Sequence, residues 1–107
     1  MPHRVAITGI GAVSPNGLGR EAFWQATRCG QSGVRPISLF DASALPVRIA
    51  GEVAGLDVAR YVRPKDRPHV SRVVPLALAA AEEALTDAGI EPEHLSRDQL
   101  RRIAVIV

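Results

Sequence analysis

The segment from about Arg72 to Ala88 constrains the fold more than any other part of the chain. Its pattern is helical, and its polar residues Glu82, Glu83, Thr86 and Asp87 fall on one face. Leu and Ala cover nearly all of the remaining surface of this helix. A helix that is apolar on most sides has to be buried, against a sheet or against another helix at close approach. We therefore predict that this segment is the core helix of the molecule.

The ends of the predicted core helix carry recognisable signals. Ser71 is placed to act as an N-cap, and Gly89 occupies the C-cap position. Pro75 conflicts with a regular helix, because beyond the first position a proline removes a helical hydrogen bond. We expect either a kink at Pro75 or a late start of the helix.

The composition indicates one small soluble domain. The chain has 107 residues, of which only 4% are aromatic, so its core has to consist of Ala, Val, Leu and Ile. The net charge of +2 is too small to indicate nucleic-acid binding. No apolar run approaches the roughly 20 residues that span a bilayer, and the N-terminus has no signal-peptide pattern. We expect a cytoplasmic protein that binds neither nucleic acid nor membrane.

Other segments of the chain predict an α/β arrangement. In chain order they are a buried strand at Val5 to Ile10, a turn at Pro15 to Gly17, a helix at Arg20 to Arg28 ended by Gly30, a strand at Val47 to Val53, and a strand at Ile103 to Val107. The first strand is apolar on both faces, which is typical of strands covered by helices on both sides. This order of strands and helices predicts an α/β layer with parallel pairing.

Glycines at positions 9 and 11 follow the first predicted strand, as in a dinucleotide-binding loop. The fingerprint requires a third glycine that opens a helix, but Ser14 holds that position and Pro15 follows it. The next helix begins only near Arg20, so its N-terminal amides would be displaced from the loop. We conclude that the glycines serve close packing after a strand, and we predict no cofactor. An NAD-binding oxidoreductase remains a remote alternative.

The chain has few other residues suited to chemistry. Cys29 lies in the last helical turn beside Arg28, but no base is coupled to it. We expect Cys29 to be a small buried residue. His3, His69 and His94 are scattered and lack the i, i+4 spacing of a metal site, so we predict no metal centre.

A basic cluster precedes the core helix. Five positive residues fall within thirteen positions, opposed only by Asp66: Arg60, Arg63, Lys65, Arg67 and Arg72. One interpretation is a solvated surface loop. The other is a docking patch for an acidic partner, which would act mainly by electrostatic steering.

Several stretches together resemble the N-terminal portion of a type II β-ketoacyl-acyl-carrier-protein synthase, of fatty acid synthesis or of its polyketide relatives. They are "RVAITGIGAVSPNGLG", "GQSGVRPISLFDASALPVRIAGEV" and "ALAAAEEALTDAGI", in the order and spacing of that family. The resemblance implies a thiolase-like α/β fold, with two similar halves that each have a sheet packed between helices. Residues 1–107 would form a truncated N-terminal domain, most of the first half.

The resemblance also implies an activity and its residues. The family condenses an acyl-thioester with malonyl-acyl-carrier-protein, using an active-site Cys that takes the acyl group and two His residues. Those motifs would lie beyond Val107, and neither Cys29 nor any of the three histidines matches them. The resemblance therefore places no catalytic residue in this chain. A non-catalytic ketosynthase-like partner, a chain-length factor, is the alternative to an enzyme.

The resemblance further implies partners. In the family, basic residues on the loop before the long helix contact the acidic acyl carrier protein, and Arg63, Lys65 and Arg67 fall in that loop. Pro64 and Pro68 stand where other members often carry additional basic residues. The full-length protein would form a homodimer or a heterodimer with a ketosynthase-like subunit.

Overall fold

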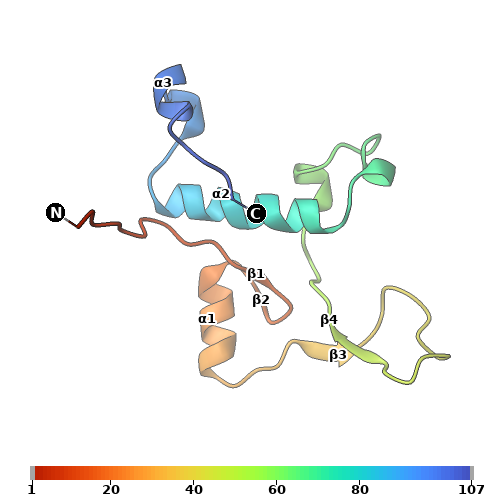
Figure 1. Cartoon of the computed structure of the whole chain (residues 1–107). Helices are drawn as coiled ribbons and strands as arrows, with labels where there is room; N and C mark the ends of the chain where they lie inside the picture. The colour runs from red at the N-terminus through yellow and green to blue at the C-terminus, as the bar shows by residue number, and fades with distance from the viewer. Residues whose placement is uncertain (1, 107) are drawn as a thin grey trace.

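Helix α2 is the element around which the rest of the structure is arranged (Figure 1). The computed structural model describes residues 2–106. In chain order the elements are β1 (Val13–Ser14), β2 (Gly17–Leu18), α1 (Arg20–Arg28), β3 (Val34–Pro36), β4 (Ile49–Gly51), the 3₁₀ turns η1 (Val58–Arg60) and η2 (Arg67–His69), α2 (Val73–Asp87), the 3₁₀ turn η3 (Pro92–His94) and α3 (Arg97–Leu100). None of the helices in this part of the chain is long and apolar enough to cross a membrane.

Helix α2 begins within one residue of the predicted start near Arg72, so the late start expected from Pro75 does not occur, and the cap also differs from the prediction. The helix begins at Val73, which places Pro75 in the first turn, where its missing N–H would have no helical partner. The N-cap is Arg72, without a side-chain hydrogen bond to the helix, so the prediction of Ser71 as N-cap is wrong. Ser71 contacts the helix through its carbonyl oxygen, which accepts from the Val74 amide at 3.0 Å, and not through its hydroxyl.

The C-terminal ends of α1 and α2 follow the sequence signals. Gly30 and Gly89 adopt φ of +68° and +67°, and each is followed by a residue whose amide reaches back into the last helical turn. In α2, the Gly89 amide donates to Thr86 O at 3.1 Å and the Ile90 amide to Leu85 O at 2.9 Å. This pair of bonds is a Schellman motif, which satisfies the last carbonyl groups of the helix.

The strands form two small antiparallel ribbons. The predicted turn is confirmed, because Pro15 and Asn16 connect β1 and β2. The centre of the predicted strand at Val47 to Val53 is also confirmed, as β4, which pairs with β3 in the register Arg35 opposite Ala50. Both ribbons are two-stranded, so the predicted parallel pairing and the sheet between helices are not formed among residues 2–106.

The two outer predicted strands differ most from expectation. Val5 to Ile10 and residues 103–106 are extended but pair with no strand, and Val107 lies outside the described residues. Val5 is 94% exposed and Ile106 is also 94% exposed. A strand that is apolar on both faces needs a neighbouring strand and a helix layer on each side. Within residues 2–106, α2 lies against only the end of the first segment and no strand neighbours either one, which explains why the predicted strands stay unpaired.

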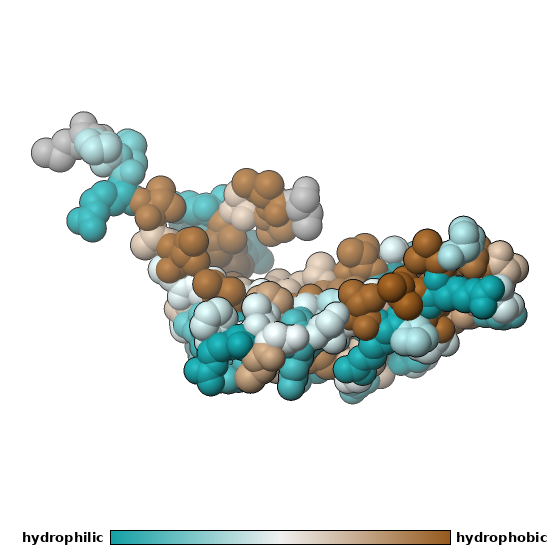
Figure 2. Space-filling model, turned by 90° about the horizontal axis from the view of Figure 1, so that it is seen from below, coloured by the Kyte–Doolittle hydropathy of each residue, from teal (hydrophilic) through white to brown (hydrophobic). Residues whose placement is uncertain are grey.

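The surface of the chain is unusually large and apolar. Its accessible area is 8959 Å², whereas a globular protein of 11.4 kDa exposes about 5,800 Å². Among the described residues, the only buried side chains are Ala26, Ala42, Val62 and Pro75. Apolar side chains lie exposed between hydrophilic ones in Figure 2. Helix α2 itself is not buried on most sides as predicted, since Leu78 is 44% exposed.

We predict that a polypeptide of these 107 residues, prepared alone, self-associates or fails to melt cooperatively. Exposed apolar side chains and unpaired extended segments favour association over a stable monomer. Light scattering coupled to gel filtration, together with calorimetric melting, would measure this. A sharp cooperative transition from a dilute monomer would contradict the prediction.

Candidate functional site

Residues 9–12 lie against α2 at a distance that only glycine permits. A Cβ atom on Gly11 would overlap the carbonyl oxygen of Ala80 and lie 2.9 Å from the Ala84 amide nitrogen. A Cβ on Gly9 would overlap the Ala84 carbonyl oxygen and lie 2.7 Å from the Ala88 nitrogen. The three alanines are one helical turn apart, so they form a stripe along which the extended chain runs. The glycines therefore serve close packing, as predicted.

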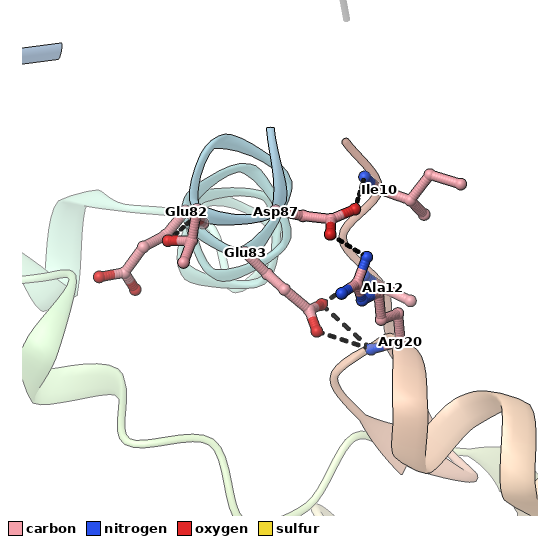
Figure 3. Close-up of polar contacts among 7 residues, drawn as sticks. Ile10, Ala12, Arg20, Glu82, Glu83 and Asp87 are labelled. Atoms are coloured by element: carbon pink, nitrogen blue, oxygen red, sulfur yellow. Dashed lines mark hydrogen bonds and ion pairs between the residues drawn. The ribbon is translucent and has the colours of Figure 1, made fainter. Parts of the chain in front are cut away.

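Two carboxylates of α2 bind the backbone amides of the same region (Figure 3). Glu83 Oε2 accepts from the Ala12 amide at 2.9 Å, and Asp87 Oδ2 accepts from the Ile10 amide at 3.0 Å. The Arg20 amide donates to Glu83 at 2.8 Å and 3.1 Å, while the Arg20 guanidinium forms an ion pair with Asp87. This carboxylate brace, Glu83 and Asp87, joins the glycine segment and α1 to α2.

The brace also fills the position that an anionic ligand would take. Arg20 is the first residue of α1, and the N-cap before it is Gly19, which has no side chain to cap the helix. The N-terminus of a helix attracts anions through its free amides and its dipole. Here Glu83 supplies that anion from another helix. The amides of Ile10, Ala12 and Arg20 thus donate to the chain's own carboxylates, which supports a packing role for the glycine segment.

The electrostatics of the brace keep Asp87 ionised at neutral pH. The hydrogen bond from the Ile10 amide lowers the pKa of the Asp87 carboxyl; partial burial opposes this, and the Arg20 guanidinium adds to the lowering. Because the pKa of Asp87 is depressed in the folded chain, Asp87 contributes stability above the ordinary pKa of aspartate. That contribution is lost only as the pH falls through the lowered value.

Glu82 points away from Glu83 and Asp87 (Figure 3). It binds the loop before α2. Glu82 Oε2 accepts from the Tyr61 hydroxyl at 2.8 Å, and Glu82 Oε1 forms an ion pair with Arg60. The hydrogen bond from the Tyr61 hydroxyl lowers the pKa of Glu82, and the Arg60 guanidinium lowers it further. The same hydrogen bond raises the pKa of Tyr61. At 100° per residue, the four polar residues of α2 lie within an arc of about 140°, so they share one broad side of the helix as predicted, but its two edges bind different segments. Glu83 and Asp87 are four residues apart and align, whereas Glu82 is turned by about 100° from its neighbour.

The basic loop between Arg60 and Arg72 is fixed at both ends. Arg60 and Tyr61 bind Glu82 at its start, and the Arg72 guanidinium donates to the Val53 carbonyl oxygen at 2.7 Å at its end. Between these anchors, Arg63, Lys65 and Arg67 are all exposed. The structure thus places the three predicted docking residues on one solvent-facing loop.

Arg63 differs from the other two docking candidates. Its Nε lies 2.6 Å from Asp66 Oδ2, in an ion pair between residues three apart. Within residues 2–106, Lys65 and Arg67 form no ion pair. The sequence interpretation missed this pairing, although the spacing of Arg63 and Asp66 in a proline-rich loop was the available signal.

Cys29 and the histidines form no reactive group among the described residues. Cys29 caps the end of α1 and is exposed, so the prediction of a buried residue is wrong. The reason is its place beyond the last helical turn, where the chain leaves the packed side of α1. His94 Nδ1 lies 2.7 Å from Glu91 Oε2 within η3, whereas His69 ends η2. No cluster of three metal-ligating side chains occurs within residues 2–106.

Comparison with known proteins assigns the chain to a family. The family described as "Beta-ketoacyl synthase, N-terminal domain" matches residues 3–107. The chain belongs to the beta-ketoacyl synthase family. It is 47% identical over 92 residues to the tetracenomycin polyketide synthase ketoacyl synthase beta subunit of Streptomyces glaucescens, covering 86% of this chain and 22% of that protein. It is 43% identical over 88 residues to 3-oxoacyl-[acyl-carrier-protein] synthase 2 of Coxiella burnetii, covering 82% and 21%.

The backbone of this chain is also similar to part of a solved structure. The structure titled "The ishigamide ketosynthase/chain length factor" aligns with a TM-score of 0.70 and 34% sequence identity, covering 84% of this chain and 22% of that one. The chain spans less than a quarter of the length of the curated relatives it matches.

We predict that Gly11→Ala destabilises the folded protein by about 3 kcal/mol or more, because the new methyl group collides with backbone atoms of α2 that cannot move independently. Gly30→Ala is the matched control. Its Cβ meets no atom within 4 Å, so it costs only the left-handed strain of about 1–2 kcal/mol.

The free energy of unfolding of both glycine variants would be measured by thermal and urea unfolding, in the longest protein that the gene encodes. If Gly11→Ala lowered the free energy of unfolding by no more than Gly30→Ala does, residues 9–12 would not pack closely against α2.

Proposed function

We propose that this chain is the N-terminal part of a 3-oxoacyl-[acyl-carrier-protein] synthase subunit, which condenses an acyl-thioester with malonyl-acyl-carrier-protein in fatty acid or polyketide biosynthesis. The observation that carries the proposal is the family match over residues 3–107, with relatives that include 3-oxoacyl-[acyl-carrier-protein] synthases. The role of this chain is structural: it supplies part of a thiolase-like half and a docking loop.

The exposed apolar segments support this role. Val5 to Ile10 and residues 103–106 carry side chains suited to interior strands, yet they lie open. In a longer protein these segments would join a sheet, and α2 would then be covered on the sides that are now exposed. The same packing would account for the excess accessible area.

The condensation chemistry would come from residues outside this chain. The reaction needs a nucleophilic thiolate to take the acyl group, and donors that stabilise the oxyanion formed on the thioester carbonyl. Cys29 is exposed at a helix end, and its side chain has no hydrogen bond to a histidine or a carboxylate among the described residues. We infer that this chain alone is inactive.

A second candidate function is a non-catalytic partner subunit of the chain-length-factor type. The observation that favours it is the 47% identity to the beta subunit of the tetracenomycin synthase, against 38% to the alpha subunit of the same synthase. The identity of the residue at the nucleophile position separates the two candidates, since a partner subunit of this type lacks the cysteine.

We predict that an acyl-thioester labels a cysteine other than Cys29 in the longest protein that the gene encodes, and that Cys29→Ala leaves the labelling unchanged. Peptide mapping by mass spectrometry after incubation with a labelled acyl-thioester would identify the cysteine. Stoichiometric labelling of Cys29 would contradict the proposal. A protein that takes no label but forms an active complex with a labelled ketosynthase subunit would support the partner function.

We further propose that Arg63, Lys65 and Arg67 dock the acidic acyl carrier protein. The loop is anchored to α2 and its charged side chains are exposed, so it presents positive charge without first having to become ordered. Exposed ion pairs contribute roughly 0.2–1 kcal/mol each, so no single residue should be indispensable. Most of the effect should fall on the association rate.

We predict that reversing Arg63, Lys65 and Arg67 to Glu together lowers carrier-dependent turnover by about tenfold or more, and that raising the salt concentration mimics the effect. Turnover of a carrier-free thioester should stay unchanged. The matched control reverses the three exposed arginines near α3, Arg97, Arg101 and Arg102, with the same change in net charge. Equal losses on both substrates, or equal losses in the control, would refute the docking role.

A further inference from the structure

The basic loop contains one acidic residue, Asp66, whose side chain has a single partner. Its Oδ2 pairs with Arg63 Nε at 2.6 Å, and the backbone joins the same two residues through the Asp66 amide and the Arg63 carbonyl oxygen at 2.9 Å. Asp66 precedes η2 but does not cap it with its side chain. The carboxylate is therefore not needed to hold the turn, and its effect in the structure is to neutralise Arg63.

The other positive side chains of the basic loop differ in whether they are already bound within the chain. Arg60 is held by Glu82, and Arg72 is held by the Val53 carbonyl oxygen. Lys65 and Arg67 are exposed on either side of Asp66 and form no ion pair within residues 2–106. An ion pair carries no net charge at a distance, so between Arg63 and Arg67 the attraction of an acidic partner comes from Lys65 and Arg67.

We propose that Asp66 attenuates docking by holding Arg63 in an ion pair within the loop, so that an acidic carrier surface meets Lys65 and Arg67 while Arg63 is held back. This inference rests on the proposed docking function and makes Asp66 a determinant of affinity. The pair is solvent-exposed, with 72% of the Arg63 side chain and 37% of the Asp66 side chain accessible. An exposed pair of this kind is weak, so a partner of sufficient negative charge can compete for Arg63.

The test is a double-mutant cycle of Asp66→Asn and Arg63→Gln in the longest protein that the gene encodes. Asparagine keeps the shape of residue 66 and removes only its charge. We expect D66N to tighten binding of a type II acyl carrier protein by about two- to fivefold and to steepen the salt dependence. The double variant should return to within about twofold of the original affinity.

The decisive quantity is the coupling between the two positions. Arg63→Gln should weaken binding in both backgrounds, but by about twofold more in the D66N background, where Arg63 has lost its ion-pair partner. The matched control is Asp98→Asn, which breaks another exposed pair between residues three apart, with Arg101, away from the loop. D98N should leave carrier affinity unchanged.

A second probe separates this inference from the proposed function. Binding of a polyglutamate peptide, measured by fluorescence anisotropy over the same cycle, reports whether Arg63 becomes available to any acidic partner. If the carrier does not bind the original protein but the peptide shows the coupling, the docking function fails and the role of Asp66 stands. Additive effects of the two substitutions on carrier binding, or no gain from D66N with either probe, would overturn the inference.

Discussion

The close approach of residues 9–12 to α2 is the constraint on which the rest of the structure depends. Gly9 and Gly11 let the backbone lie on the alanine stripe of the helix, and no larger residue fits there. The approach brings the backbone amides of Ile10 and Ala12 within reach of Asp87 and Glu83. Buried or half-buried amides need partners, and the helix supplies them in the form of carboxylates. Steric fit and hydrogen bonding thus support each other.

Helix α2 connects this packed side to the basic loop on its other side. Glu83 and Asp87 fix the glycine segment and α1, while Glu82 fixes the start of the basic loop through Arg60 and Tyr61. The position of the exposed charges therefore depends on the same helix that organises the core.

The sequence predicted the helix ends marked by glycine better than the N-cap of α2 or the long-range packing. Helix α1 was predicted at its observed bounds, and the glycines at 30 and 89 end their helices as expected, because caps and turns depend on neighbours in the chain. The strands at Val5 to Ile10 and Ile103 to Val107 were predicted from apolar runs, but such strands form only when other strands and helices cover them. The brace of Glu83 and Asp87 was missed because its partners are 63 to 77 residues away in the chain.

Hydrogen exchange at residues 9–20 tests the central claim, that carboxylates of α2 and not a phosphate ligand satisfy the glycine segment. The account predicts slow exchange of the backbone amides of Ala12 and Arg20 in the longest protein that the gene encodes, with no ligand added. Exchange should become at least about tenfold faster in Glu83→Gln, since glutamine has no charge and one acceptor oxygen where Glu83 has two, and a hydrogen bond to a charged group is worth about 1.5–3 kcal/mol. Glu93→Gln, an exposed control, should change nothing. Rapid exchange in the original protein that slows only when a nucleotide or inorganic phosphate is added would contradict the account.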